Sequence, residues 1–160
     1  MDATRLLEKQ HREVEALFAA LKKGPKDARK TVKELARKLL AHMVIEQSTF
    51  YPAVKEADED AIHEAYEEHH GARGAIARLL ATDDDDETFD AKVTTLEELI
   101  SHHVKEEEKE LFPKVRKRLE AEQLAALGEA MEREFDRLVE RLPRTLHARA
   151  EAVDVLADAV

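Results

Sequence analysis

Apolar residues recur at every third or fourth position in five stretches of the chain, which is the spacing of an amphipathic helix. The pattern predicts helices over residues 3–23, 27–56, 60–81, 88–118 and 121–141. Because the breaks between them are short, neighbouring helices run antiparallel. We therefore expect an all-α fold: an antiparallel up-down-up-down four-helix bundle over residues 1–120, with residues 121–160 as a C-terminal helix and tail that pack on the bundle or trail from it. After Pro143 we expect a short helix or a mobile tail.

The composition agrees with this fold and narrows the possible partners. A chain of 160 residues forms one domain, and 39% charged residues with only 4 Gly and 4 Pro exclude an all-β fold. The net charge of −10, without a basic stripe, argues against nucleic acid or an anionic membrane as partner. In the absence of cysteine, any metal must be held by nitrogen and oxygen ligands. No signal peptide and no long apolar run is present, so we expect a cytoplasmic protein.

The second and fourth predicted helices carry the same pattern at an offset of 61 residues. His42 matches His103, and Glu46 matches Glu107 one turn later on the same helix face. The surrounding frame repeats as well: Val32, Leu35, Leu39, Phe50, Tyr51, Pro52 and Val54 match Val93, Leu96, Ile100, Leu111, Phe112, Pro113 and Val115. Each proline is expected to kink or end the regular helix.

The first and third helices repeat more weakly, at an offset of 58 residues. His11 falls in the apolar stripe of the first helix and matches His69 in the stripe of the third. His70 lies about 100° round the helix from that stripe, so His69 points inward and His70 outward. By the same argument, His103 points inward and His102 flanks it.

Each bundle helix therefore directs one histidine into the core, and two helices add a glutamate. Buried imidazoles and carboxylates need a common partner, and a pair of cations satisfies all of them. The predicted metal ligands are His11, His42, Glu46, His69, His103 and Glu107, with the glutamates bridging and the histidines terminal. This donor set suits iron, manganese or zinc, and six protein ligands leave positions open for a small molecule.

Other interpretations of these residues compete with this one. A single inward histidine is more often an ordinary core residue than a ligand. Glu8 with His11, and Glu67 with His70, fit the Glu-x-x-His spacing of carboxylate-rich di-iron bundles, but this set turns the third helix away from its apolar stripe. Four further side chains have open roles near the centre: Glu15 and Arg73 as a salt bridge or as solvated residues, and Tyr51 and Tyr66 as packing aromatics, a ligand or a redox partner.

These residues resemble the hemerythrin-like HHE cation-binding domains, whose pattern is His, His-x-x-x-Glu, His, His-x-x-x-Glu with an aromatic-Pro pair after each glutamate. The match covers residues 3–118. The resemblance implies a hemerythrin-like four-helix bundle around two non-heme iron ions with an oxo or hydroxo bridge, for which manganese or zinc can substitute. Oxygen-carrying hemerythrins have a further histidine where this chain has Arg73, and a His-to-Glu spacing of five where Glu107 follows at four. These two departures argue against reversible oxygen carriage.

Two classes of function follow from such a centre. The first is a di-iron protein that binds dioxygen, peroxide or nitric oxide and handles or senses them. The second is an enzyme of catalase-like or peroxidase type, or a protein that stores iron. A metal-free helical scaffold is the third and weakest alternative. The expected partners are a small diatomic ligand or peroxide, and a monomer or weak dimer is expected.

Overall fold

The computed structural model describes residues 1–24 and 27–142, and the expected tail after Pro143 lies outside this range. Its long helices follow the predicted stretches closely: α1 (Ala3–Lys22), α2 (Ala28–Ile45), α4 (Glu59–Leu80), α5 (Phe89–Glu106) and α7 (Ala121–Arg141). Two short helices, α3 (Tyr51–Val54) and α6 (Phe112–Arg118), extend α2 and α5 beyond a π-helical turn. A 3-10 turn over Lys55–Ala57 leads from α3 into α4.

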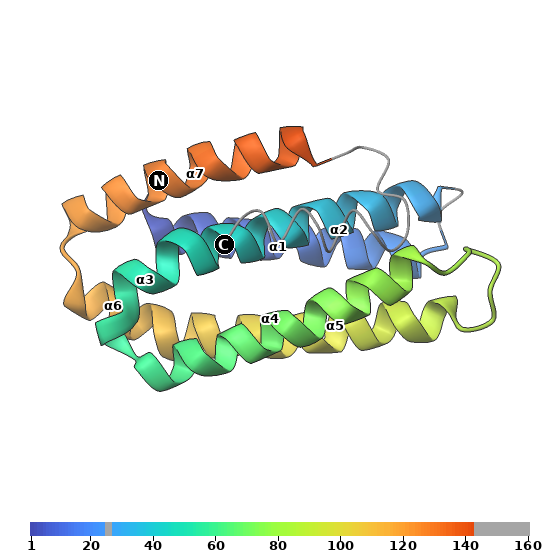
Figure 1. The fold of residues 1–160 in the computed structure, drawn as a ribbon, viewed down its shortest axis with the longest axis horizontal. Coiled ribbons are helices and arrows are strands. Elements are labelled where there is room, and N and C mark those ends of the chain that lie inside the picture. Colours follow the sequence, from blue (N-terminus) through green and yellow to red (C-terminus); the bar gives the residue numbers. More distant parts are fainter. Residues whose placement is uncertain (25–26, 143–160) are drawn as a thin grey trace.

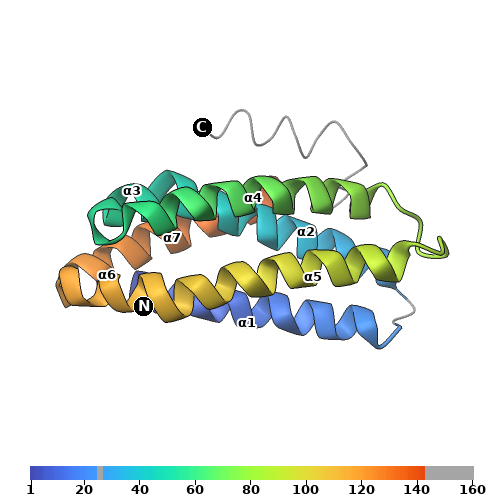
Figure 2. The ribbon, with the colours of Figure 1, turned by 90° about the horizontal axis from the view of Figure 1, so that it is seen from below.

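The helices α1, α2, α4 and α5 form the antiparallel four-helix bundle that the sequence predicts. Helices α4 and α5 lie side by side, and α7 runs along the opposite side of the bundle against α1 and α2 (Figures 1 and 2). The described part of the chain contains no strand, in agreement with the expected fold class. None of the described helices is long and apolar enough to cross a membrane.

Polar side chains fix where three of the helices begin. The carboxylate of Asp2 accepts the backbone N–H of Arg5, and that of Asp58 accepts the N–H of Ala61. At the start of α7, Glu120 and Gln123 cap each other's backbone in a capping box. Such caps satisfy N–H groups that have no partner within the helix, and so they set the helix ends.

A π-helical turn precedes each repeated proline and begins at each repeated glutamate. These turns span Glu46–Phe50 and Glu107–Leu111. The N–H of Tyr51 bonds to the carbonyl of Glu46, five residues back, and the N–H of Phe112 bonds to that of Glu107 in the same way. The sequence predicts a kink at each proline; the structure instead places the irregularity one turn earlier, where the wider turn admits the proline. Such turns are frequent at functional sites.

Gly128 allows α7 to approach the start of α1. A methyl group at this position would overlap the carbonyl oxygen of Met1 and lie 2.8 Å from the backbone nitrogen of Ala3. Both obstacles are backbone atoms, so we expect Gly128→Ala to destabilise the protein by roughly 1–3 kcal/mol, as overpacking does elsewhere. Urea unfolding measures this change.

Gly71→Ala is the matched control for this substitution. Gly71 also lies within a helix, α4, but a methyl group there meets no atom within 4 Å. Relief of the helix penalty of glycine should stabilise the protein by roughly 0.5–1 kcal/mol. Equal effects of the two substitutions would contradict the close approach of α7 to α1.

Candidate metal centre

The structure brings all six predicted ligands together in the middle of the bundle. His11 comes from α1, His42 from α2, His69 from α4 and His103 from α5, while Glu46 and Glu107 open the two π-helical turns. None of the six is more than 5% exposed. Because each helix contributes its residues through its apolar stripe, the packing that forms the core also forms the site.

Each carboxylate lies between histidines of the two halves. Glu46 places Oε1 3.1 Å from Nε2 of His42 and Oε2 3.2 Å from Nε2 of His69. Glu107 places Oε2 3.4 Å from Nε2 of His11 and 3.6 Å from Nε2 of His103. The ligand atoms form two groups that share Glu46: His11, His42, Glu46 and Glu107 in one, and Glu46, His69 and His103 in the other. Glu46 therefore lies where one carboxylate can reach both groups of ligand atoms.

Three of the histidines have their other ring nitrogen held by a polar side chain. Nδ1 lies 2.8 Å from Glu108 in His11, 2.7 Å from Gln10 in His42 and 2.7 Å from Glu68 in His103. A neutral imidazole that donates from Nδ1 has a lone pair at Nε2. In each of the three, Nε2 faces the centre.

Several buried polar atoms of the centre have no hydrogen-bond partner in the part of the chain that the structure describes. Both oxygens of Glu46, Oε2 of Glu107 and Nε2 of His11 are buried without a hydrogen-bond partner among the described residues. A buried polar atom without a partner costs roughly 1–3 kcal/mol, and more when it is charged. Cations would satisfy these atoms together.

The spacing of the ligand atoms fits first-row transition metals. Metal–nitrogen and metal–oxygen bonds of about 2.0–2.2 Å place neighbouring ligand atoms roughly 3.0–3.5 Å apart. The separations between histidine and glutamate atoms run from 3.1 to 3.6 Å, and the Nε2 atoms of His69 and His103 are 3.0 Å apart. The residues therefore fit a pair of such ions.

Protonation in the metal-free centre is set by burial and by neighbouring charges. Burial, with help from His11 and His103 respectively, lowers the pKa values of His42 and His69 well below the usual range, so both are neutral. Burial and the nearby Glu107 raise the pKa of Glu46 well above its usual value. Burial acts against ionisation of Glu107, but His103 and His11 outweigh it and lower the pKa of that carboxyl.

Metal loading should therefore release protons. An ion that binds Glu46 displaces the proton that its raised pKa retains, and so the apparent metal affinity rises with pH. We expect net proton release on titration with ferrous ion near pH 7, measured by calorimetry in buffers of different ionisation enthalpy. Loading without proton release would show that Glu46 is already ionised in the metal-free protein.

Comparison with known proteins settles the family. The model of the hemerythrin HHE cation-binding domain family matches residues 2–115. The chain belongs to this family. A crystal structure of an HHE cation-binding domain-containing protein from Mycobacterium kansasii has the same fold, with a TM-score of 0.82, 22% identity and coverage of 100% of this chain and 99% of that one. A DNA nickase from Nostoc sp. (strain PCC 7120) is 25% identical over 126 residues, which are 77% of this chain and 36% of the nickase.

The two halves of this HHE domain differ at one aromatic position beside the carboxylates. The hydroxyl of Tyr51 donates to Oε1 of Glu107 at 3.0 Å and lies 3.4 Å from Nε2 of His69. Its repeat partner Phe112 stacks on His11 and offers no polar group. The ring of Tyr51 packs in the core, and its hydroxyl also belongs to the polar centre. Tyr66 is partly exposed and donates to the backbone carbonyl of Gln47 at 3.2 Å.

Of the two alternatives that the sequence left open for Glu15 and Arg73, the salt bridge between them does not form in this HHE domain. Glu15 is exposed and pairs with Arg12 on its own helix at 2.9 Å. The half-buried Arg73 instead donates to the side-chain oxygen of Gln47, the residue after Glu46. Neither of the two sequence alternatives, a salt bridge or full solvation, describes Arg73.

The carboxylate-rich alternative set also does not assemble. Glu8 pairs with Arg116 at 2.6 Å, and both Glu67 and His70 are exposed. His63 and His102 lie on the surface as well. The centre of this HHE domain is therefore rich in histidine, with two carboxylates.

A small apolar cavity adjoins the ring of four histidines on the side away from the carboxylates. Its volume is about 10 Å³, roughly the space of one water-sized molecule. The remaining walls are entirely apolar: Val14, Leu39, Met43, Ile100 and Val104. A small ligand at the centre of this HHE domain would meet hydrocarbon on that side.

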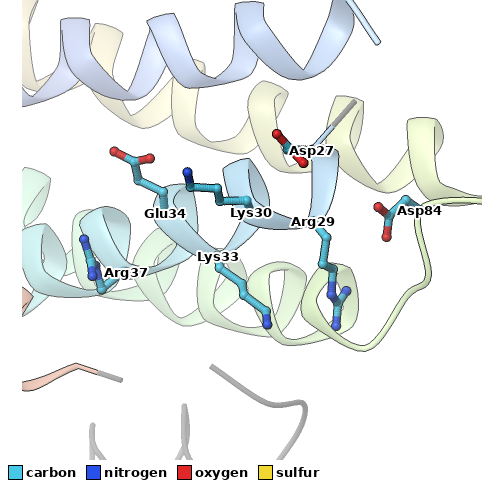
Figure 3. A pocket seen from close by; sticks show the side chains of 7 residues that line it. All are labelled: Asp27, Arg29, Lys30, Lys33, Glu34, Arg37 and Asp84. Atoms are coloured by element: carbon cyan, nitrogen blue, oxygen red, sulfur yellow. The ribbon is translucent and has the colours of Figure 1, made fainter. Parts of the chain in front are cut away.

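A larger hollow on the surface is a different feature. It has a volume of about 610 Å³ and lies along the outer face of α2, where seven charged side chains line it (Figure 3): Asp27, Arg29, Lys30, Lys33, Glu34, Arg37 and Asp84. These side chains spread in different directions and do not converge on one point. The hollow therefore has the character of a solvated charged face, unlike the buried cluster of histidines and glutamates in the bundle core.

Proposed function

We propose that this HHE protein holds two iron ions between the four histidines and two glutamates, and that it binds dioxygen, peroxide or nitric oxide there. The donor set supports the metal assignment, because imidazole and carboxylate without sulfur suit iron, with manganese or zinc as substitutes. When bound, the ions would supply Lewis acidity and reversible electron transfer. Two ions of this kind need more ligands than six side chains provide, so positions remain for a small molecule.

The apolar cavity beside the histidines carries this proposal. A cavity of about 10 Å³ beside the histidines has space for about one water-sized molecule, so it favours the smallest ligands and excludes larger substrates. Its walls favour an uncharged gas over an ion, because an ion would lose its hydration without replacement. The side of the centre away from the cavity is polar: there the Tyr51 hydroxyl lies beside Glu107 and can donate a proton.

Filling the cavity should slow ligand binding without loss of iron. Val14→Leu adds one methylene group at a wall residue, in a cavity with space for about one water. We expect the rate of reaction of the reduced protein with nitric oxide or oxygen to fall by roughly tenfold or more, which corresponds to about 1.4 kcal/mol in the barrier. Anaerobic stopped-flow absorption measures the rate, and iron analysis checks the occupancy.

The same substitution far from the cavity is the control. Val139 packs partly buried on α7 and lines no wall of the cavity, so Val139→Leu should leave the rate unchanged. If Val14→Leu binds nitric oxide and oxygen at the wild-type rate, the ligand does not enter by this cavity.

Peroxide turnover is the second candidate function, favoured by the position of Tyr51. A phenol hydrogen-bonded to Glu107 and close to His69 is a proton donor within the centre. The balanced reaction converts two molecules of hydrogen peroxide into two of water and one of dioxygen. Addition of peroxide to the iron-loaded protein separates the two functions: a stable spectral adduct indicates binding, and sustained evolution of oxygen indicates catalysis.

A further inference from the structure

A second cluster of metal-ligating side chains lies on the surface between α4 and α5. His102 places Nε2 3.4 Å from Oε1 of Glu68 and 3.2 Å from Oε1 of Glu106. The ligand atoms of the three residues all lie within 4.8 Å of one another. His102 is 66% exposed, so an ion could reach the cluster directly from solvent.

The cluster has the composition and spacing of a coordination site. One imidazole with two carboxylates is a donor set that zinc, manganese and ferrous ions accept. The separations of 3.2 and 3.4 Å match the roughly 3.0–3.5 Å between neighbouring ligand atoms on such an ion. Three side chains on one open face leave the remaining positions to water.

The surroundings of the cluster concentrate negative charge. The carboxylates of Glu64, Glu68 and Glu110 all lie close enough to the carboxyl of Glu106 to repel its negative charge. A divalent cation would relieve this repulsion. The repeat does not explain the cluster, because the positions in the first half that match His102 and Glu106 are Ala41 and Ile45, both buried.

Glu68 connects this cluster to the buried centre. Its Oε1 faces His102, while its Oε2 accepts the Nδ1–H of His103 at 2.7 Å. A carboxylate on Nδ1–H strengthens the metal bond formed by Nε2 of the same imidazole. A cation on Oε1 would withdraw negative charge from that hydrogen bond and weaken His103 as a ligand.

We infer that Glu68, His102 and Glu106 form a third divalent-cation site, and that an ion bound there weakens the hold of His103 on the buried centre through Glu68. The existence of the surface site is independent of the proposed function, whereas its effect on the centre rests on that function. By linkage, an occupied centre and an occupied surface site weaken each other equally.

Zinc titration of the iron-loaded protein tests the inference. After removal of excess iron, calorimetry and elemental analysis should find one zinc bound per chain with the buried iron retained. His102→Ala should raise the Kd for this zinc by roughly tenfold or more, as loss of one of three ligands predicts. Zinc should also shift the ferric absorption spectrum of the wild type and leave that of His102→Ala unchanged.

His63→Ala is the matched control, because His63 is also an exposed histidine, on α4, and lies 4.0 Å from a glutamate one turn away, Glu59. It should bind zinc as the wild type does. If zinc does not bind, or binds equally to His102→Ala, the surface site is overturned. A spectrum unmoved by bound zinc overturns the link through Glu68. Failure of the protein to load iron at all would contradict the proposed function and leave the zinc stoichiometry as the test of the surface site.

Discussion

Glu46→Gln is expected to abolish binding of both iron ions and to make the metal-free protein more stable. Glu46 reaches histidines of both halves, so its loss removes a ligand from each ion. Iron should fall from about two per chain to near zero. One bound ligand whose free concentration is a thousand times its Kd stabilises a protein by about 4 kcal/mol. The wild type should therefore gain roughly 10 °C or more in Tm on loading with iron, and the variant should gain none.

The higher stability expected of the metal-free Glu46→Gln variant has an electrostatic cause. The pKa of the Glu46 carboxyl is raised on folding, because burial and Glu107 disfavour its charge. A raised carboxyl pKa costs stability above the pKa of the unfolded chain, and the cost grows as pH rises towards the folded pKa. The neutral amide of the Glu46→Gln variant does not titrate and carries no such cost. The metal-free variant should therefore melt above the metal-free wild type, by a margin that widens from about pH 5 to pH 7.

Glu110→Gln provides the control, since Glu110 is an exposed glutamate one turn beyond Glu107. It should retain both irons and the Tm gain on loading. Retention of two irons by Glu46→Gln would show that Glu46 does not bridge.

Glu108→Ala is expected to weaken the binding of one of the two ions and to leave the binding of the other unchanged. Glu108 accepts the Nδ1–H of His11 at 2.8 Å and contacts no other predicted ligand in the described residues. Loss of such a supporting carboxylate typically costs 10- to 100-fold in metal affinity. His103, which belongs to the other group of ligands, keeps Glu68. Iron titration should therefore become biphasic, with a tight first ion and a second one weaker by roughly 10- to 100-fold.

Gln47 offers a matched comparison, because it occupies the position equivalent to Glu108 in the repeat. Its side chain is bound by Arg73 and supports no histidine, and Nδ1 of His69 has no partner among the described residues. Gln47→Ala should leave both affinities near those of the wild type. If Glu108→Ala lowers the affinity for both ions equally, or if Gln47→Ala has the same effect, then Glu108 does not support His11 alone.

The bundle and the grouping of the six residues could be predicted because both follow from periodicity. The apolar stripe that buries a helix also fixes which histidine points inward, as with His69 beside the exposed His70. The duplication then supplied the strongest signal, since a matched His-x-x-x-Glu inside a matched apolar frame rarely arises by chance.

The residues that support the histidines could not be predicted, because each acts across a helix interface. Gln10 and Glu68 each precede a ligand on their own helix but hold a histidine of the neighbouring helix, His42 and His103. A signal was present, since the two supporting residues match each other at the offset of 58 residues. Their targets depend on how the helices are rotated against each other, which one helix's pattern does not determine.

The asymmetry between Tyr51 and Phe112 was visible in the sequence, but its consequence was not. Whether the hydroxyl of Tyr51 meets a carboxylate or hydrocarbon depends on the π-helical turn that precedes it. Arg73 shows the same limit: its partner Gln47 lies on another helix.

Anomalous diffraction at the iron edge, from crystals loaded with ferrous ion, tests the central claim most directly. Two peaks roughly 3.5–4 Å apart, as in other carboxylate-bridged pairs, should lie between the Nε2 atoms of the four histidines, with Glu46 and Glu107 touching both. A single peak, peaks confined to the surface, or none between these histidines would contradict the account.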